Sequence, residues 1–240
     1  MRAIAVIPAR WQSSRFPGKP LADLNGRIII RLVYEKVVAS SIFAEVIVAT
    51  DDERIRQAVE VFGGKVEMTR TDHRSGTDRV AEVCRRHEFD IVVNVQGDEP
   101  MIATQPLKDL VKAFEDKEVM VASLMNRLTD NIDNPNQVKV VIDRNGDALY
   151  FSRAVIPYER DNEQTAEYWG HIGVYAFRKE MLETFVKLPE SKLEKVEKLE
   201  QLRLLENGYK IRMIATEYQG KGIDTPEDLV QLMKYMKRRG

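Results

Sequence analysis

The loop after the first apolar run of the 240-residue chain carries three cationic side chains, Arg10, Arg15 and Lys19. Residues 4–7 form that run and predict a buried parallel strand. Guanidinium groups can fork onto phosphate or carboxylate oxygens, a lysine ammonium is a mobile point charge, and Gly18 lets the backbone approach a ligand closely. The loop therefore predicts an anion site at the carboxyl edge of a parallel sheet, although a solvated surface loop could carry the same residues.

Two aspartates after other predicted strands offer the oxygen ligands that hard divalent cations prefer. Asp98 follows the apolar run 90–95, and Asp224 follows a glycine-rich segment near the C-terminus. Glu99 precedes a proline that keeps its backbone extended, so Asp98 is the preferred ligand. Two loop carboxylates beside a cationic loop predict a magnesium–triphosphate site, and hence a soluble α/β enzyme of nucleotide or phosphate chemistry.

A second polar loop, residues 70–79, follows the predicted strand 65–69. Arg70 and Arg74 could hydrogen-bond a base carbonyl or brace phosphates, and Thr77 could cap the next helix. A solvated turn between a strand and a helix would have the same composition. The loop is therefore a second candidate for nucleotide contacts.

Polar side chains that could line a pocket for an acidic substrate also occur in the second half of the chain, and they are Arg153, Tyr158, His171, Glu200 and Gln201. Loop arginines are usually solvated, and a lone histidine is more often structural than catalytic. Glu200 and Gln201 lie beside the apolar stripe of a predicted helix, residues 193–205, and could face the interior.

The positions of these residues depend on an alternation of strands and helices that predicts a mostly parallel α/β sheet. Predicted strands at 45–50, 65–69 and 90–95 alternate with helical patterns. From residue 119 the pattern changes to short strands at 120–124, 138–143 and 148–152, with a hairpin signal at Asn145-Gly146. This block predicts an antiparallel β-lobe inserted in a single domain, residues 1–240.

Composition narrows the class of protein further. The net charge is −1, and no basic stripe with interleaved aromatic residues occurs, which disfavours nucleic acid as a partner. The sequence has no apolar run of membrane-spanning length and no signal-peptide pattern. Cys84 is the one cysteine, so an internal disulfide or a thiolate zinc cluster is excluded. These features predict a soluble protein of the reducing cytoplasm, without membrane association.

Several segments together resemble the CMP-Kdo synthetase (3-deoxy-manno-octulosonate cytidylyltransferase) family. The resemblance is carried by residues 7–10, 16–20, 49–52, 75–79, 94–100, 150–153, 171–175, 199–203 and 222–228. The opening motif is shared by many sugar nucleotidyltransferases, whereas N-V-Q-G-D-E-P at 94–100, with the segments at 171–175 and 199–203, is specific to Kdo-type members. The match runs from end to end. It implies a nucleotidyltransferase-type fold.

The resemblance also implies an activity and a set of contacts. The activity is transfer of a cytidylyl group from CTP to 3-deoxy-manno-octulosonate (Kdo), with release of pyrophosphate, for lipopolysaccharide biosynthesis. The implied catalytic residues are Lys19, Arg10, Asp98 and Asp224, and the last two would bind Mg²⁺. The implied CTP contacts are Arg10, Ser13, Ser14, Lys19, Arg70, Arg74, Ser75 and Gly76. The implied Kdo contacts are Arg15, Gln96, Arg153, Tyr158, His171, Glu200 and Gln201.

At the level of the chain, the family implies a homodimer formed through the β-lobe. Residues 1–118 would mainly bind CTP, and residues 119–177, which include the lobe, would serve sugar binding and dimerisation. Two alternatives remain open. One is a cytidylyltransferase for a related sugar acid, such as sialic acid or an amino-Kdo, and the other is a non-catalytic nucleotide-binding protein of the same fold.

Overall fold

The computed structural model describes residues 1–12, 15–161, 166–220 and 222–237, and the chain divides into two compact units. Unit 1 comprises residues 1–108 and 220–240, and unit 2 comprises residues 109–219. The expected division of labour, with residues 1–118 for CTP and 119–177 for the sugar and the dimer, stays a prediction. No helix among the described residues is long and apolar enough to cross a membrane.

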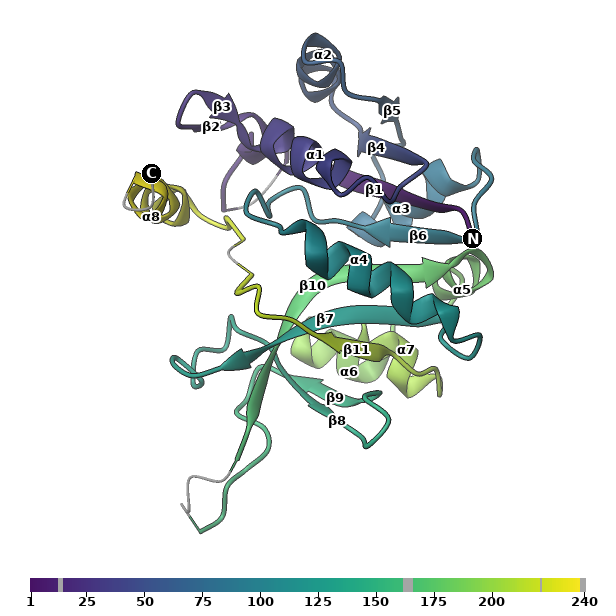
Figure 1. The fold of residues 1–240 in the computed structure, drawn as a ribbon, viewed down its shortest axis with the longest axis vertical. Coiled ribbons are helices and arrows are strands. Elements are labelled where there is room, and N and C mark those ends of the chain that lie inside the picture. The colour runs from purple at the N-terminus through teal and green to yellow at the C-terminus, as the bar shows by residue number, and fades with distance from the viewer. Residues whose placement is uncertain (13–14, 162–165, 221, 238–240) are drawn as a thin grey trace. The chain divides into compact units, whose positions relative to one another are not determined.

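Unit 1 is built on four parallel strands in the order β6-β1-β4-β5 (Figure 1). They are β1 (Ala3–Ala9), β4 (Glu45–Thr50), β5 (Val66–Met68) and β6 (Ile91–Asn94). Val6 on β1 is paired with Ile47 on one side and Asn94 on the other. The apolar side chains of β1 are almost completely buried, as expected for a parallel strand covered on both faces. Each large aliphatic side chain buried in this way stabilises the fold by about 1.5–3 kcal/mol.

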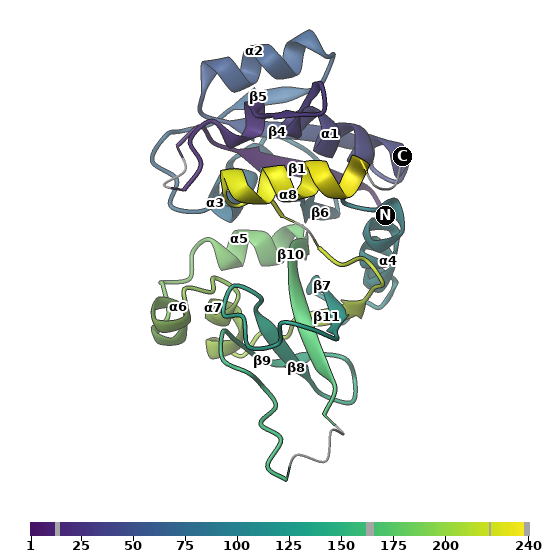
Figure 2. The ribbon, with the colours of Figure 1, turned by 90° about the vertical axis from the view of Figure 1, so that its left-hand side faces the viewer.

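Helices cover both faces of this sheet. The helices and short elements of unit 1 are the 3-10 turn η1 (Lys19–Leu21), the hairpin β2 (Asp23–Leu24) and β3 (Arg27–Ile28), α1 (Ile29–Ala39), α2 (Glu53–Val61), α3 (Gly76–Cys84) and α8 (Pro226–Lys237). Figures 1 and 2 show α1 and α3 on opposite faces of β1 and β4. Helix α4 (Thr104–Lys112) begins in unit 1 and ends in unit 2.

Unit 2 contains the predicted antiparallel strands. They are β7 (Val121–Leu128), β8 (Lys139–Ile142) and β9 (Ala148–Ser152). β10 (Tyr168–Arg178) is added to them, and β11 (Arg212–Ala215) lies parallel to β7. β10 pairs antiparallel with both β7 and β8, and β8 pairs antiparallel with β9. The predicted turn between β8 and β9 is confirmed, because Gly146 has a φ of 80° and Asp143 Oδ1 accepts the Asn145 N–H at 2.8 Å.

The remaining helical elements of unit 2 lie after β10, except for a 3-10 turn after α4. They are η2 (Ala113–Glu115), α5 (Lys179–Phe185), α6 (Lys192–Glu197) and α7 (Leu202–Glu206). Figures 1 and 2 place α5, α6 and α7 on one face of the strands of unit 2. The predicted single helix 193–205 is wrong, because Lys198 adopts a left-handed conformation with a φ of 55° and ends α6. Glu200 and Gln201 therefore lie in the turn before α7, not on a helix.

Two local predictions in unit 1 are also wrong. β1 runs past the end of the predicted strand 4–7 to Ala9. Beyond Val6 it pairs only with β4, so the missing N–H of Pro8 removes at most one hydrogen bond of the ladder. α3 is capped by Ser75, whose hydroxyl accepts the Asp78 N–H at 3.1 Å, and not by Thr77. The start of α8 is capped by a 3.2 Å hydrogen bond from the N–H of Asp228 to the hydroxyl of Thr225.

Candidate active site

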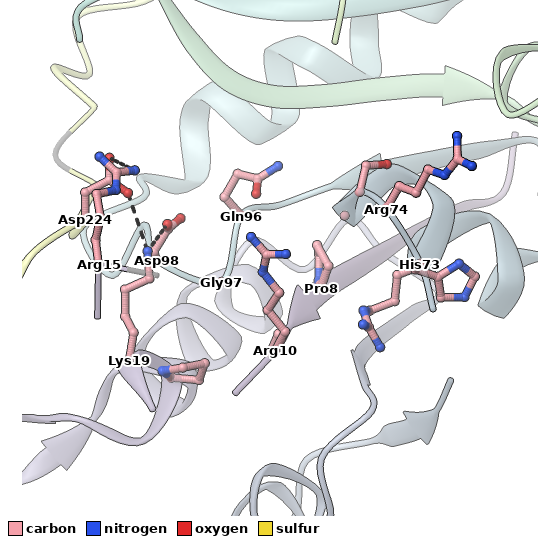
Figure 3. Close-up of a pocket in the computed structure, with 15 residues that line it drawn as sticks. Pro8, Arg10, Arg15, Lys19, His73, Arg74, Gln96, Gly97, Asp98 and Asp224 are labelled. Carbon is pink, nitrogen blue, oxygen red and sulfur yellow. Dashed lines mark hydrogen bonds and ion pairs between the residues drawn. The ribbon is translucent and has the colours of Figure 1, made fainter. Parts of the chain in front are cut away.

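A polar pocket of about 260 Å³ in unit 1 gathers most of the residues predicted to bind a nucleotide (Figure 3). Its lining includes the cations Arg10, Arg15, Lys19 and Arg74 and the carboxylates of Asp98 and Asp224. These residues come from loops that follow β1 and β6 or precede α3 and α8. Parallel strands end at the same edge of a sheet, and this is why segments far apart in the sequence meet there.

Lys19 lies at the point where the two carboxylates converge. Its Nζ donates to Asp98 Oδ2 at 2.5 Å and to the carbonyl of Ile223 at 2.7 Å, and it lies 3.6 Å from Asp224 Oδ1. The Lys19 side chain is only 14% exposed, so solvent screens these contacts weakly. Arg15 adds a second cation, with Nη2 at 3.1 Å from Asp224 Oδ2. Figure 3 shows these four side chains in one group.

The same arrangement fits a divalent cation. Two carboxylates that both contact one ammonium nitrogen can also ligate one metal ion, and carboxylate oxygen is the ligand that Mg²⁺ prefers. Within the described residues, no group of three or more potential side-chain ligands occurs. A magnesium ion held by Asp98 and Asp224 would therefore take its other ligands from phosphate oxygens and water.

The cationic loop is anchored through Trp11. The Arg54 guanidinium stacks on the indole at 3.4 Å from the ring centroid, while its Nε and Nη2 are forked onto the carboxylate of Asp52 at 2.9 and 2.6 Å. On the other side, the N–H of Gly18 donates to the carbonyl of Trp11 at 2.9 Å. These contacts hold the two ends of the loop, and so the positions of Arg10 and Lys19, before any ligand binds.

The loop before α3 contributes three predicted contacts to the pocket, namely Arg74, Ser75 and Gly76. Arg70 lies outside the pocket lining, where its Nε donates to Asp72 Oδ1 at 2.9 Å. This ion pair raises the pKa of Arg70 and lowers the pKa of Asp72. The predicted residues Ser13 and Ser14 lie outside the described residues.

Sequence reasoning missed two features of this pocket. Arg79 lines it from α3, is 4% exposed, and pairs through Nη2 with Asp51 Oδ2 at 2.8 Å. The available signal was an arginine at helical spacing from the apolar residues of α3. The second feature is Gly97, where a Cβ would lie 2.8 Å from the carbonyl oxygen of Pro8, so only glycine fits between β6 and the end of β1.

The predicted sugar contacts are divided between the units. Arg15 and Gln96 line the pocket of unit 1, whereas the other five belong to unit 2. In unit 2, the guanidinium of Arg153 is bound to the backbone, because its Nε donates to the carbonyl of Glu197 at 2.7 Å. Tyr158 is 85% exposed.

Two of the other predicted sugar contacts in unit 2, His171 and Glu200, lie near Tyr175, which sequence reasoning missed. The rings of His171 and Tyr175 are 5.3 Å apart, and burial followed by the charge of Glu200 raises the pKa of the Tyr175 hydroxyl well above 10. The neighbouring Gln201 is buried, and its Nε2 has no hydrogen-bond partner within the described part of the chain. Alternation along β10 was the signal for Tyr175, which lies four residues after His171.

Burial determines the charge of His171. It lowers the pKa of the imidazole from 6.5 to about 3, so the ring is neutral near pH 7. Nε2 lies 3.0 Å from the hydroxyl of Ser123 on β7, and Phe151 packs against the ring with its centroid at 5.0 Å. Ser123 is a further residue that no pattern in the sequence selects.

Comparison with known proteins places the whole chain in one family. Residues 4–211 match the Cytidylyltransferase family. The 3-deoxy-manno-octulosonate cytidylyltransferase of Bacteroides thetaiotaomicron is 47% identical over 251 residues, covering 100% of both sequences. The protein of the same name from Flavobacterium johnsoniae is 49% identical over 234 residues, covering 95% of this chain and 96% of its own.

A solved structure gives the same result for the fold. The structure of a CMP:2-keto-3-deoxy-manno-octonic acid synthetase complexed with CTP matches with a TM-score of 0.96 and 46% identity, covering 100% of both chains. The predicted nucleotidyltransferase-type α/β fold is thereby confirmed. Because the sequence and the fold both match over the full length, this chain belongs to the cytidylyltransferase family and, within it, to the 3-deoxy-manno-octulosonate cytidylyltransferases, or CMP-Kdo synthetases.

Proposed function

We propose that this chain transfers the cytidylyl group of CTP to Kdo, forming CMP-Kdo and pyrophosphate. The observation that carries the proposal is the convergence of Asp98, Asp224 and Lys19 in one pocket with Arg10 and Arg15. Carboxylates and cations in this mixture suit a metal-bound triphosphate. Membership of the family identifies the two substrates.

The CTP side of the site uses the loops of unit 1. Arg10 and Lys19, with Ser13 and Ser14, bind the triphosphate and offset the charge that develops on the departing pyrophosphate. Arg74, Ser75 and Gly76 contact the cytosine and ribose of CTP. Arg70 joins these contacts when its guanidinium leaves the carboxylate of Asp72 for the nucleotide. The anchored loop lowers the entropic cost of binding because its two ends are already held.

The sugar side needs one group for the carboxylate and several for the hydroxyls. Arg15 pairs with the carboxylate of Kdo, which as a monoanion suits a forked guanidinium. The neutral or acidic side chains of Gln96, His171, Glu200 and Gln201 hold hydroxyls, and Arg153 and Tyr158 contribute from the loop after β9. In this arrangement the carboxylate of Kdo pairs with a cation, and its hydroxyls meet neutral or acidic groups.

Mg²⁺ is the proposed metal cofactor, held by Asp98 and Asp224. When bound, it supplies neutralisation of phosphate charge and lowers the cost of ionising the sugar hydroxyl. The chain's own residues orient the anomeric hydroxyl toward the α-phosphorus. A bond forms between that oxygen and the α-phosphorus, the bond from the α-phosphorus to the oxygen that bridges to the β-phosphate breaks, and the hydroxyl proton is released to solvent as pyrophosphate leaves.

The setting of the reaction is also proposed. The product would serve lipopolysaccharide biosynthesis in the cytoplasm. The working form would be a homodimer, for which the exposed apolar residues Leu149 and Val155 of unit 2 supply a partial contact surface.

The bond chemistry can be tested by ³¹P NMR of a mixture containing the protein, CTP, Mg²⁺ and Kdo. The proposal predicts loss of the three CTP resonances and growth of a phosphodiester and of pyrophosphate in equal amounts. Formation of CDP or of inorganic phosphate as the initial product would contradict it, because those products require cleavage at a different phosphorus.

A further inference from the structure

The hydroxyl of Ser123 in unit 2 lies close to three hydrogen-bond partners, and the hydroxyl of Tyr175 also lies near it and can donate to its remaining lone pair. The Oγ of Ser123 lies 3.0 Å from Nε2 of His171, 3.0 Å from the carbonyl oxygen of Val174 and 3.3 Å from that of Ile172. The two carbonyls converge on one oxygen because β10 departs from regular register with β7 between Ile172 and Tyr175. Ser123 is fully buried, so no bulk solvent competes for these contacts.

A count of hydrogens decides the arrangement. A serine hydroxyl has one hydrogen, and carbonyl oxygens can only accept. If the hydroxyl donated to His171, the lone pairs of Oγ would face two carbonyl oxygens with no hydrogen between them, which is repulsive at these distances. If the hydroxyl donates to Val174, a lone pair of Oγ remains to accept a hydrogen from Nε2, and the contacts are compatible.

The neutral imidazole therefore carries its hydrogen on Nε2 and leaves a lone pair on Nδ1. The ring cannot turn freely, because Phe151 and Tyr175 pack on it with centroid distances of 5.0 and 5.3 Å. Its own backbone N–H is fixed to the carbonyl of Val138 at 2.8 Å. Across the described residues, no hydrogen bond to Nδ1 occurs, so this acceptor remains available to a ligand.

We propose that Ser123 is a positioning residue, which holds His171 as the Nε2–H tautomer so that Nδ1 accepts a hydrogen bond from a hydroxyl group of the sugar substrate. The tautomer stands on the structure alone, whereas the sugar hydroxyl rests on the proposed function. An acceptor-only nitrogen discriminates in favour of a hydroxyl and against a carbonyl or carboxylate oxygen at the same position. Ser123 would thus contribute to substrate selection without touching the substrate.

The tautomer is tested by ¹⁵N NMR of the histidine rings in the substrate-free protein, with the signals of His171 assigned by their loss in His171→Gln. We expect a protonated Nε2 and an unprotonated Nδ1 between pH 6 and 8. In Ser123→Ala the signals should move toward an average of the two tautomers, and Ser123→Thr should restore them. A wild-type ring with its hydrogen on Nδ1 would overturn the proposal, and that measurement needs no variant to fold.

Kinetics test the effect on the substrate. Loss of one positioned hydrogen bond predicts that Ser123→Ala raises the KM for Kdo roughly 3- to 10-fold, leaves the KM for CTP unchanged, and is rescued by Ser123→Thr. Ser152→Ala is the matched control, because Ser152 is another buried serine of unit 2 and donates to Glu197 instead. A merely structural role predicts an equal rise in the KM values for Kdo and CTP, or no rescue by threonine. Either result would overturn the proposal.

The two proposals fail in different ways. If the chain did not use Kdo, NMR would still show the expected tautomer, and only the kinetic experiment would fail, because no turnover of Kdo would be measured. If the chain uses Kdo but the tautomer is the opposite one, the role of Ser123 is wrong and the proposed function stands.

Discussion

Charge compensation dominates the candidate site at the scale of single residues. Lys19 contacts the carboxylates of Asp98 and Asp224, and Arg15 contacts that of Asp224. The cations and carboxylates of this cluster neutralise one another. When a phosphate ligand and its metal bind, the cations can pair with the phosphate and the carboxylates with the metal, so no buried charge is left unpaired.

Asp98→Asn tests the role of that cluster. The substitution keeps the shape of the side chain but removes its charge, so the fold should persist while turnover falls about 100-fold or more. Pyrophosphate release and the melting temperature together measure this. Asp90→Asn is the matched control, because Asp90 directly precedes β6, whereas Asp98 follows it, and it should retain activity. Near-normal turnover in Asp98→Asn would rule out the assigned role.

The lowered pKa of the His171 imidazole predicts a dependence of stability on pH. Its pKa falls from 6.5 in the unfolded chain to about 3 in the fold. Below pH 6.5 the unfolded chain thus binds a proton that the folded chain does not, and stability is lost as the pH falls from 6.5 toward 3.

Urea unfolding at pH 7.5 and pH 5.0 measures this effect. The wild type should lose about 1–2 kcal/mol more of its free energy of unfolding than His171→Gln over that interval. Equal losses in the two proteins would show that the ring does not carry the lowered pKa.

At the scale of elements, the cationic loop depends on one close approach. Gly18 has a φ of 73°, and a Cβ there would lie 2.9 Å from the Trp11 ring. The ring would have to move, and with it the stack on Arg54 that anchors the loop.

Gly18→Ala should therefore raise the KM for CTP about 10-fold or more, since small displacements of positioning groups are costly. Gly26→Ala is the control, because Gly26 has a φ of 84° but a Cβ added there would meet no atom within 4 Å. Both variants carry the same backbone cost of about 1 kcal/mol, and only the first moves Trp11. Tryptophan emission in a Trp169→Phe background reports that movement. Identical CTP kinetics in the two variants would contradict the anchoring role of Trp11.

The accuracy of sequence-based prediction differs between elements for physical reasons. The strands of unit 1 and the turn at Asn145-Gly146 follow from apolar runs and turn chemistry, which are local. The break at Lys198 could not be predicted, because no glycine or proline marks it and the apolar pattern continues after it at Leu199 and Leu202. The ion pair of the buried Arg79 with Asp51 joins residues far apart in sequence, which local patterns do not reveal.

At the scale of the whole molecule, the predicted CTP contacts belong to unit 1 and most of the predicted Kdo contacts belong to unit 2. The pocket of unit 1 is rich in charge, with cations and carboxylates on loops at the end of a parallel sheet. The group of His171, Tyr175 and Gln201 in unit 2 is mostly neutral and partly buried. The proposed function assigns these contacts to a charged nucleotide and to a polyhydroxylated sugar acid, and the family motifs, rather than the fold pattern, indicate which sugar acid to expect.

The most direct measurement is the rate of pyrophosphate release with CTP and Mg²⁺, with Kdo, sialic acid or no sugar as the acceptor. The proposed function predicts rapid release with Kdo and only background release in the other two reactions. Release that is equally fast with sialic acid, or that does not need a sugar, would contradict the claim that this site joins CTP to Kdo.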